Sequence, residues 1–147
     1  MNGKDMHGYF FEDLRTGMVA TYGKTITEAD ILLFAAVSGD TKPSHLNEEF
    51  ARKTRLKTRV AHGALTSSLV SAALGTRLPG PGCLFVSQTS NFRAPVKAGD
   101  TVTARVTLSR LDPKRNFAEF ETVCTVGDTV VLDSSARSTV AELNRQL

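Results

Sequence analysis

The segment that most constrains the fold runs from residue 64 to residue 77 and carries no charge before Arg77. Its sequence, ALTSSLVSAALGTR, predicts a helix with Leu65 and Leu69 on one side and small residues, Ser71 among them, on another. A helix without a charged face is usually buried. The Pro-Gly-Pro-Gly sequence that follows ends it sharply. We therefore expect one central helix covered by the rest of the chain.

The remainder of the C-terminal half reads as strands. Residues 102–110 alternate apolar and polar side chains, which is typical of a half-buried antiparallel strand, and residues 117–126 repeat the pattern. Further strands are expected over 17–26, 83–93 and 129–143. An antiparallel sheet needs an apolar cover for its inner face. The sequence therefore predicts an α+β fold in which a curved antiparallel sheet wraps around the central buried helix.

A second helix is expected before the central one. Thr27 and Asp30 have the spacing of a capping box, and Gly39 suits the end of the helix. The apolar face of this helix is expected to contain Ile31, Leu32, Phe34, Ala35 and Val37. Residues 39–45 should then form a loop, because Pro43 fixes its own φ and restricts its predecessor. A short helix is expected over 47–53.

Length and composition indicate one ordinary domain. A chain of 147 residues fits a single domain with its own core. No apolar run is long enough to cross a bilayer, and the N-terminal sequence lacks the apolar core of a signal peptide, so a cytoplasmic location is the expectation. Cys83 and Cys124 are expected as buried thiols in a reducing compartment. Together with the three histidines they have no metal-ligand spacing, so no metal is expected.

Most of the positive charge lies in one segment. The net charge is +3, and five basic residues fall within 52–59: Arg52, Lys53, Arg55, Lys57 and Arg59. No aromatic residue is interleaved with them, which argues against a surface that stacks nucleic-acid bases. Two interpretations stay open, a solvated surface and a site for the phosphates of an anionic ligand.

Candidate catalytic residues lie on both sides of this basic segment in the sequence. Asp40 and His45 lie five positions apart around Pro43, and His62-Gly63 directly precedes the central helix. An Asp and a His near one water can exchange protons with a substrate, and an N–H at a helix N-terminus can stabilise a negative oxygen. A turn aspartate, a structural histidine and a helix-start glycine would produce the same pattern.

Three segments resemble a known family. Ser38-Gly39-Asp40-Thr41-Lys42-Pro43-Ser44-His45-Leu46-Asn47 resembles the hydratase motif of MaoC-like proteins, the (R)-specific enoyl-CoA hydratases and related dehydratases. Ala61-His62-Gly63-Ala64-Leu65 and Asn91-Phe92-Arg93-Ala94-Pro95-Val96 follow in the family's order. The resemblance covers about residues 17–141 and implies a single hot-dog domain over 1–147.

The resemblance also implies roles for individual residues. Asp40 and His45 would activate the catalytic water, and the Gly63 N–H would bind the thioester oxygen. His62 and Ser71 would orient the site. Weaker candidates for contacts with the substrate are Lys42, Lys57, Arg59 and Arg93. No cofactor is implied, since coenzyme A is part of the substrate, and a homodimer is implied, with no nucleic acid and no membrane as partner.

One position departs from the family pattern, because Lys42 stands where the family usually has Asn. A lysine cannot accept a hydrogen bond, and its charge can lower the basicity of Asp40. The main expectation is hydration of trans-2-enoyl-CoA or the reverse dehydration, within fatty acid metabolism. Two alternatives stay open: dehydration of a 3-hydroxyacyl group on acyl carrier protein, and a non-catalytic module that binds acyl thioesters.

Overall fold

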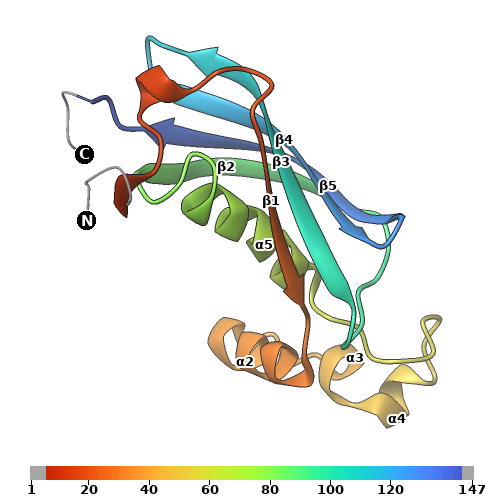
Figure 1. Ribbon diagram of the computed structural model, residues 1–147. Helices are drawn as coiled ribbons and strands as arrows, with labels where there is room; N and C mark the ends of the chain where they lie inside the picture. Colours follow the sequence, from red (N-terminus) through yellow and green to blue (C-terminus); the bar gives the residue numbers. More distant parts are fainter. Residues whose placement is uncertain (1–5, 144–147) are drawn as a thin grey trace.

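Five antiparallel strands form one sheet in the order β1-β3-β4-β5-β2 (Figure 1). The structure is a computed structural model and describes residues 6–143. The strands are β1 (Val19–Thr25), β2 (Cys83–Phe92), β3 (Thr101–Asp112), β4 (Phe117–Val126) and β5 (Thr129–Val140). All five lie where the sequence predicted strands, and β5 ends three residues earlier than the predicted range.

The central helix α5 (Gly63–Thr76) lies along the concave face of this sheet (Figure 1). Its buried residues pack on the inner row of β3, where Val102, Ala104, Val106 and Leu108 are all 1% exposed or less. The predicted alternation of β3 is therefore confirmed. The expectation of a central helix buried against the sheet is confirmed, and Gly63, Ala64, Ser68 and Ser71 on its other side are exposed in the single chain. The sheet covers one side of α5, and the side of small residues stays open.

Helix α2 (Glu28–Ser38) begins and ends where its capping residues predicted. The Thr27 hydroxyl accepts from the Asp30 N–H, the Asp30 carboxylate accepts from the Thr27 N–H, and Gly39 ends the helix in the left-handed region at φ 77°. The predicted apolar face is wrong in part. Ile31 and Ala35 are buried, but the exposed apolar side chains are Leu32 (57%), Leu33 (64%) and Val37 (87%).

Two single-turn helices follow α2. They are α3 (Pro43–Leu46) and α4 (Glu48–Ala51), and a 3₁₀ turn, η1 (Phe11–Asp13), precedes β1. The predicted loop over 39–45 is therefore wrong at its end: Pro43 starts a helical turn, as proline does at a first helical position, and His45 lies on that turn. The Asn47 side chain caps α4, within the helix predicted over 47–53.

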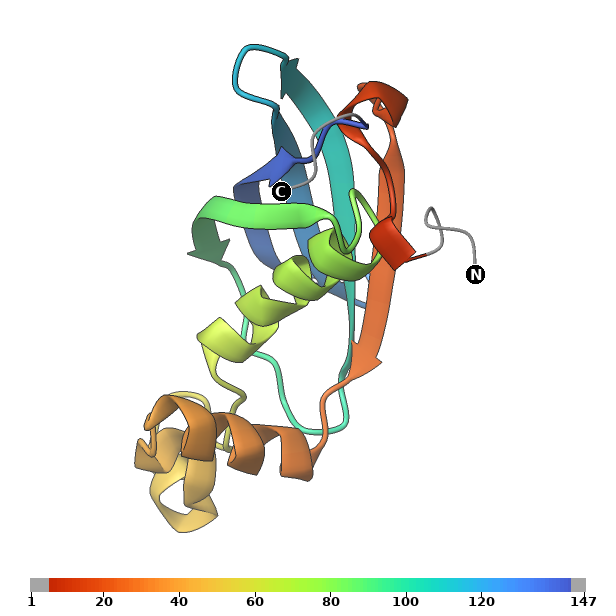
Figure 2. The same ribbon diagram turned by 90° about the vertical axis from the view of Figure 1, so that its left-hand side faces the viewer.

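Helices α2, α3 and α4 lie together beyond one end of the sheet, next to the N-terminal end of α5 (Figure 2). This arrangement brings the segment after α2 close to the start of α5, although 22 positions separate Asp40 from His62. Within residues 6–143, no helix combines the length and apolar character needed to span a bilayer.

Candidate active site

Three side chains from different elements meet at the N-terminal end of α5. Asp40 follows the left-handed Gly39 that ends α2, His45 lies on α3, and His62 is the residue before α5. One nitrogen or carboxylate oxygen of each lies within 4.8 Å of the others. The structure thus brings together the two residues predicted to be catalytic and one of those predicted to orient them.

The environment of His45 assigns its two ring nitrogens. The imidazole is buried, and its Nδ1 lies 2.7 Å from the carbonyl oxygen of Val60. A carbonyl can only accept, so Nδ1 carries the proton and the neutral ring keeps a lone pair on Nε2. Nε2 faces Oδ2 of Asp40 at 3.8 Å, which is too long for a direct hydrogen bond. The two atoms are therefore acceptors that face each other and can share one donor.

The surroundings of His45 favour its neutral form. Burial is the largest influence and lowers the pKa of His45 below its ordinary value of 6.5. Positive charge on His62 or Lys42 lowers it further, while the bond to Val60 and the Asp40 carboxylate act in the opposite direction. The net shift is downward, which favours the neutral ring with its Nε2 lone pair at pH 7.

His62 binds the Asp40 backbone. Its ring is 1% exposed, and Nε2 donates to the carbonyl oxygen of Asp40 at 2.8 Å. The ring stacks on His45 with centroids 3.8 Å apart and packs against Phe34 at 4.9 Å. Among the described residues, its Nδ1 is buried without a hydrogen-bond partner. These contacts give His62 the geometry of an orienting residue.

The same three residues have to be weighed as metal ligands. A zinc ion would need nitrogen lone pairs that converge at about 2.0–2.1 Å. The lone pairs of a histidine lie in the plane of its ring, and the planes of His45 and His62 are stacked with an angle of 28° between them. Lone pairs from stacked rings run side by side and do not converge. This geometry suits a shared water better than a metal, and the expectation of no metal stays a prediction.

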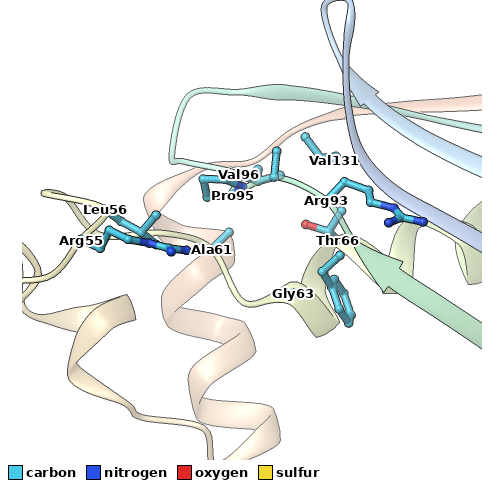
Figure 3. A pocket seen from close by; sticks show the side chains of 11 residues that line it. Arg55, Leu56, Ala61, Gly63, Thr66, Arg93, Pro95, Val96 and Val131 are labelled. Atoms are coloured by element: carbon cyan, nitrogen blue, oxygen red, sulfur yellow. The ribbon is translucent and has the colours of Figure 1, made fainter.

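Gly63 places a free donor next to this cluster. It is the first residue of α5, so its N–H has no acceptor within the helix. A Cβ at this position would lie 2.9 Å from Cε1 of Phe92, so the Phe92 ring allows no side chain here as it stands. Gly63 and Phe92 line a cleft of about 270 Å³ (Figure 3). Arg55 and Arg93 also line it and bring positive charge to the cleft.

The weaker candidates have different surroundings. Arg93, directly after β2, lines the cleft and pairs with Asp133 of β5. Lys42 is exposed directly before α3, and its backbone N–H donates to Asp40 Oδ1 at 3.4 Å. Lys57 is exposed in a turn with φ 61°.

Two of the predicted residues, Ser71 and Arg59, lack the surroundings that their proposed roles require. Ser71 is exposed on α5, eight residues beyond Gly63 and therefore about 12 Å farther along the helix axis. The Arg59 guanidinium is bound by Glu28 and Glu48. The roles proposed for both residues stay predictions.

Among the residues that line the cleft, sequence reasoning did not single out Arg55 or Phe92. Arg55 lay within the basic segment, but nothing distinguished it from its four basic neighbours. Phe92 stood inside the third motif, and only the close approach of its ring to Gly63 reveals its place. The motif itself was the available signal.

The fold and the site together define the class of protein. A long helix packed on the concave face of a curved antiparallel sheet, with an Asp-His pair and a glycine N–H at the start of the helix, is the arrangement of a hot-dog hydratase or dehydratase domain. The chain belongs to the MaoC-like domain family, whose model matches residues 12–131. The resemblance recognised in the sequence is thereby confirmed.

Individual relatives agree with this assignment. The chain is 50% identical to an (R)-specific enoyl-CoA hydratase of Rhodospirillum rubrum, over 92% of this chain and 94% of the relative. It is 50% identical to a 3-hydroxybutyryl-CoA dehydratase of Methylorubrum extorquens, over 86% and 81% of the two chains. An R-hydratase of Pseudomonas aeruginosa, solved in the unliganded form, superposes with a TM-score of 0.85 at 38% identity and covers 90% of this chain and 86% of its own.

Proposed function

We propose that this enzyme adds water to trans-2-enoyl-CoA to form (R)-3-hydroxyacyl-CoA, and catalyses the reverse dehydration. The observation that carries the proposal is the pair of facing acceptors, Asp40 Oδ2 and His45 Nε2, 3.8 Å apart beside the free N–H of Gly63. Family membership and the names of the relatives support a CoA thioester substrate and the (R) configuration of the hydroxyacyl product.

The residues of the site have complementary tasks in this reaction. A water that donates one hydrogen bond to Asp40 and the other to His45 keeps its oxygen lone pairs available for attack on C3 of the enoyl group. The pair accepts one proton from this water as the C3–O bond forms, and a proton is returned to C2. Between these events, negative charge develops on the thioester oxygen, where the Gly63 N–H and the α5 dipole stabilise it. The net change is addition of H and OH across the double bond.

Hydration of crotonyl-CoA, followed by the loss of enoyl-thioester absorbance, tests the proposal. Wild-type protein should turn over without any added cofactor, and Asp40→Ala and His45→Ala should each lose about 10²–10⁴-fold in kcat. The circular dichroism of both variants should remain that of the wild type. Near-wild-type turnover by both folded variants would remove the assignment, and a wild type that binds the thioester without turnover would favour the non-catalytic module.

Acyl carrier protein is the second candidate for the carrier of the acyl group. Arg52 and Lys53 are largely exposed, and Arg55 extends the same basic surface to the cleft. Such a surface suits an acidic protein as well as the phosphates of CoA. Comparison of kcat/KM for crotonyl groups on CoA and on carrier protein separates the two candidates, and we expect CoA to be preferred.

The proposed assembly is a homodimer formed through β2. This edge strand carries three consecutive exposed apolar residues, Leu84 (58%), Phe85 (42%) and Val86 (47%). An exposed apolar edge strand invites pairing, and α5 packs beside this strand. Light scattering should give twice the 15.9 kDa mass of the chain, and a monomer at micromolar concentration would refute the dimer.

The proposed location is the cytoplasm. Cys83 and Cys124 are both free thiols, as is usual for proteins of a reducing compartment. Fractionation of cells that produce the native protein, with activity followed in each fraction, tests this location.

A further inference from the structure

Arg59 is the most highly connected ionic side chain near the site, although it does not touch the Asp40 or His45 side chains. Its Nη1 and Nη2 donate to the two oxygens of Glu28 at 2.9 and 2.8 Å, a two-point contact that favours one orientation. Its Nε donates to Oε2 of Glu48 at 3.2 Å. The hydrogen bonds to Glu28 are the first cause that raises the pKa of Arg59 above its ordinary value.

These contacts connect three segments that surround the dyad. Glu28 is the first residue of α2, the helix that leads to Asp40, and Glu48 is the first residue of α4, which follows His45. The Glu48 carboxylate also accepts from the Arg59 backbone N–H at 3.1 Å and from the Thr58 hydroxyl at 3.4 Å. The carboxylate therefore holds the Arg59 backbone and the Thr58 side chain as well as the guanidinium.

The segment held in this way supplies the partner of His45. The Val60 N–H donates to the Ser44 carbonyl at 3.2 Å, and the Val60 carbonyl accepts from His45 Nδ1 at 2.7 Å. The Arg59 guanidinium approaches the His45 carbonyl at 3.4 Å. The position of the carbonyl of Val60, the residue after Arg59, thus decides which nitrogen of His45 keeps its lone pair.

We propose that Arg59, through its ion pairs with Glu28 and Glu48, positions the Val60 carbonyl and so holds His45 in the tautomer whose Nε2 is free to accept a proton. The inference rests on the proposed hydratase function and deepens it. It also assigns one member of the basic segment: Arg59 is a positioning residue, with its Nε and both Nη groups bound within the protein. Glu28, Glu48 and the His45 carbonyl use four of its five N–H donors, so binding of CoA phosphates would have to rely on one Nη2 N–H or break these contacts.

A positioning role and a phosphate-binding role for Arg59 predict different kinetics for its variants on a substrate that lacks the CoA phosphates. Arg59→Lys retains the charge but cannot reproduce the fork that binds both carboxylates. If Arg59 positions His45, kcat should fall about ten- to a hundredfold on both crotonyl-CoA and crotonyl-N-acetylcysteamine, which has no phosphate. The KM for crotonyl-CoA should change less than about twofold on the same grounds, since binding contacts are kept.

The state of the histidine ring supplies a second, direct readout. Long-range ¹H–¹⁵N correlation spectra should show His45 protonated at Nδ1 in the wild type and a mixture of tautomers in Arg59→Lys and in Glu48→Gln. Glu49→Gln is the matched control, because it breaks another ion pair of α4, that with Lys53 at 3.9 Å, whose side chains are 87% and 78% exposed. This control should leave both the kinetics and the spectrum unchanged.

Specific results would overturn the inference. A raised KM for crotonyl-CoA with normal turnover of the N-acetylcysteamine thioester would assign Arg59 to phosphate binding. Wild-type kinetics and an unchanged His45 tautomer in folded Arg59→Lys would remove any positioning role. If Arg59→Lys fails to fold, Glu28→Gln serves for the same comparison, because it retains the contact between Arg59 and Glu48. Wild-type protein without turnover would instead refute the hydratase function itself.

Discussion

Asp40→Asn changes the proposed water site by a single atom and leaves its shape intact. The carboxylate offers Oδ2 as an acceptor opposite His45 Nε2, whereas an amide nitrogen at that place is a donor. The water would then lose one of its two acceptors. The Lys42 N–H can still donate to the oxygen that remains, so the turn between α2 and α3 keeps its hydrogen bond.

Asp40→Asn should affect the rate far more than the stability of the fold. Removal of a group that transfers a proton in the transition state costs about 10²–10⁴-fold in rate. That loss corresponds to about 3–5 kcal/mol of activation free energy. The Asp40 side chain is about half exposed (49%), and such surface substitutions change the free energy of unfolding by roughly 0.5 kcal/mol or less. The kcat should therefore collapse while the Tm stays within a few degrees.

The chain contains a matched control for this variant. Asp128 follows Gly127 at the turn between β4 and β5, and Gly127 has a positive φ (55°), as Gly39 does before Asp40 (77°). Asp128→Asn tests what a turn aspartate contributes by itself. Crotonyl-CoA hydration should be lost in Asp40→Asn and normal in Asp128→Asn. If both variants retain wild-type kcat, Asp40 is a turn residue only and the reasoning is wrong.

Three further predictions follow from the same geometry. Burial lowers the pKa of His45 below 6.5, and the neutral form accepts the proton, so activity should persist as the pH falls through 6.5 and decline only below it. Lys42→Asn removes a positive charge that lowers this pKa, so the acidic limb of the kcat profile should move to higher pH. An unmoved limb would contradict this reasoning. Gly63→Ala should lower kcat by up to about 10²–10³-fold, the cost of an oxyanion donor, because its Cβ collides with Phe92. Gly75→Ala on the same helix, where a Cβ meets nothing within 4 Å, should be harmless in the same assay. Dialysis against EDTA should leave kcat unchanged, and a loss restored by zinc would show that the stacked rings do bind a metal.

The sequence correctly predicted the helices and strands whose signal lies in neighbouring residues. The alternation of β3 reports which side chains avoid water, and the capping box of α2 involves residues three positions apart, so both are readable from neighbours in the chain. The same information did not predict that Leu32 and Val37 would be exposed. Helical periodicity shows that a face is apolar, but it does not show whether another part of the same chain covers that face.

For the site, the sequence by itself determined the parts and the tertiary structure decided their relations. Asp40, His45 and Gly63 were recognisable from motif and spacing. The tautomer of His45 depends on Val60, 15 positions away, and Arg59 finds one of its carboxylates 31 positions away in Glu28. No periodicity connects such residues, because their contacts exist only once α2, α3 and the segment before α5 have packed together. The folding of these segments against each other therefore decides that His45 presents a lone pair, and with it the chemistry that the motif allows.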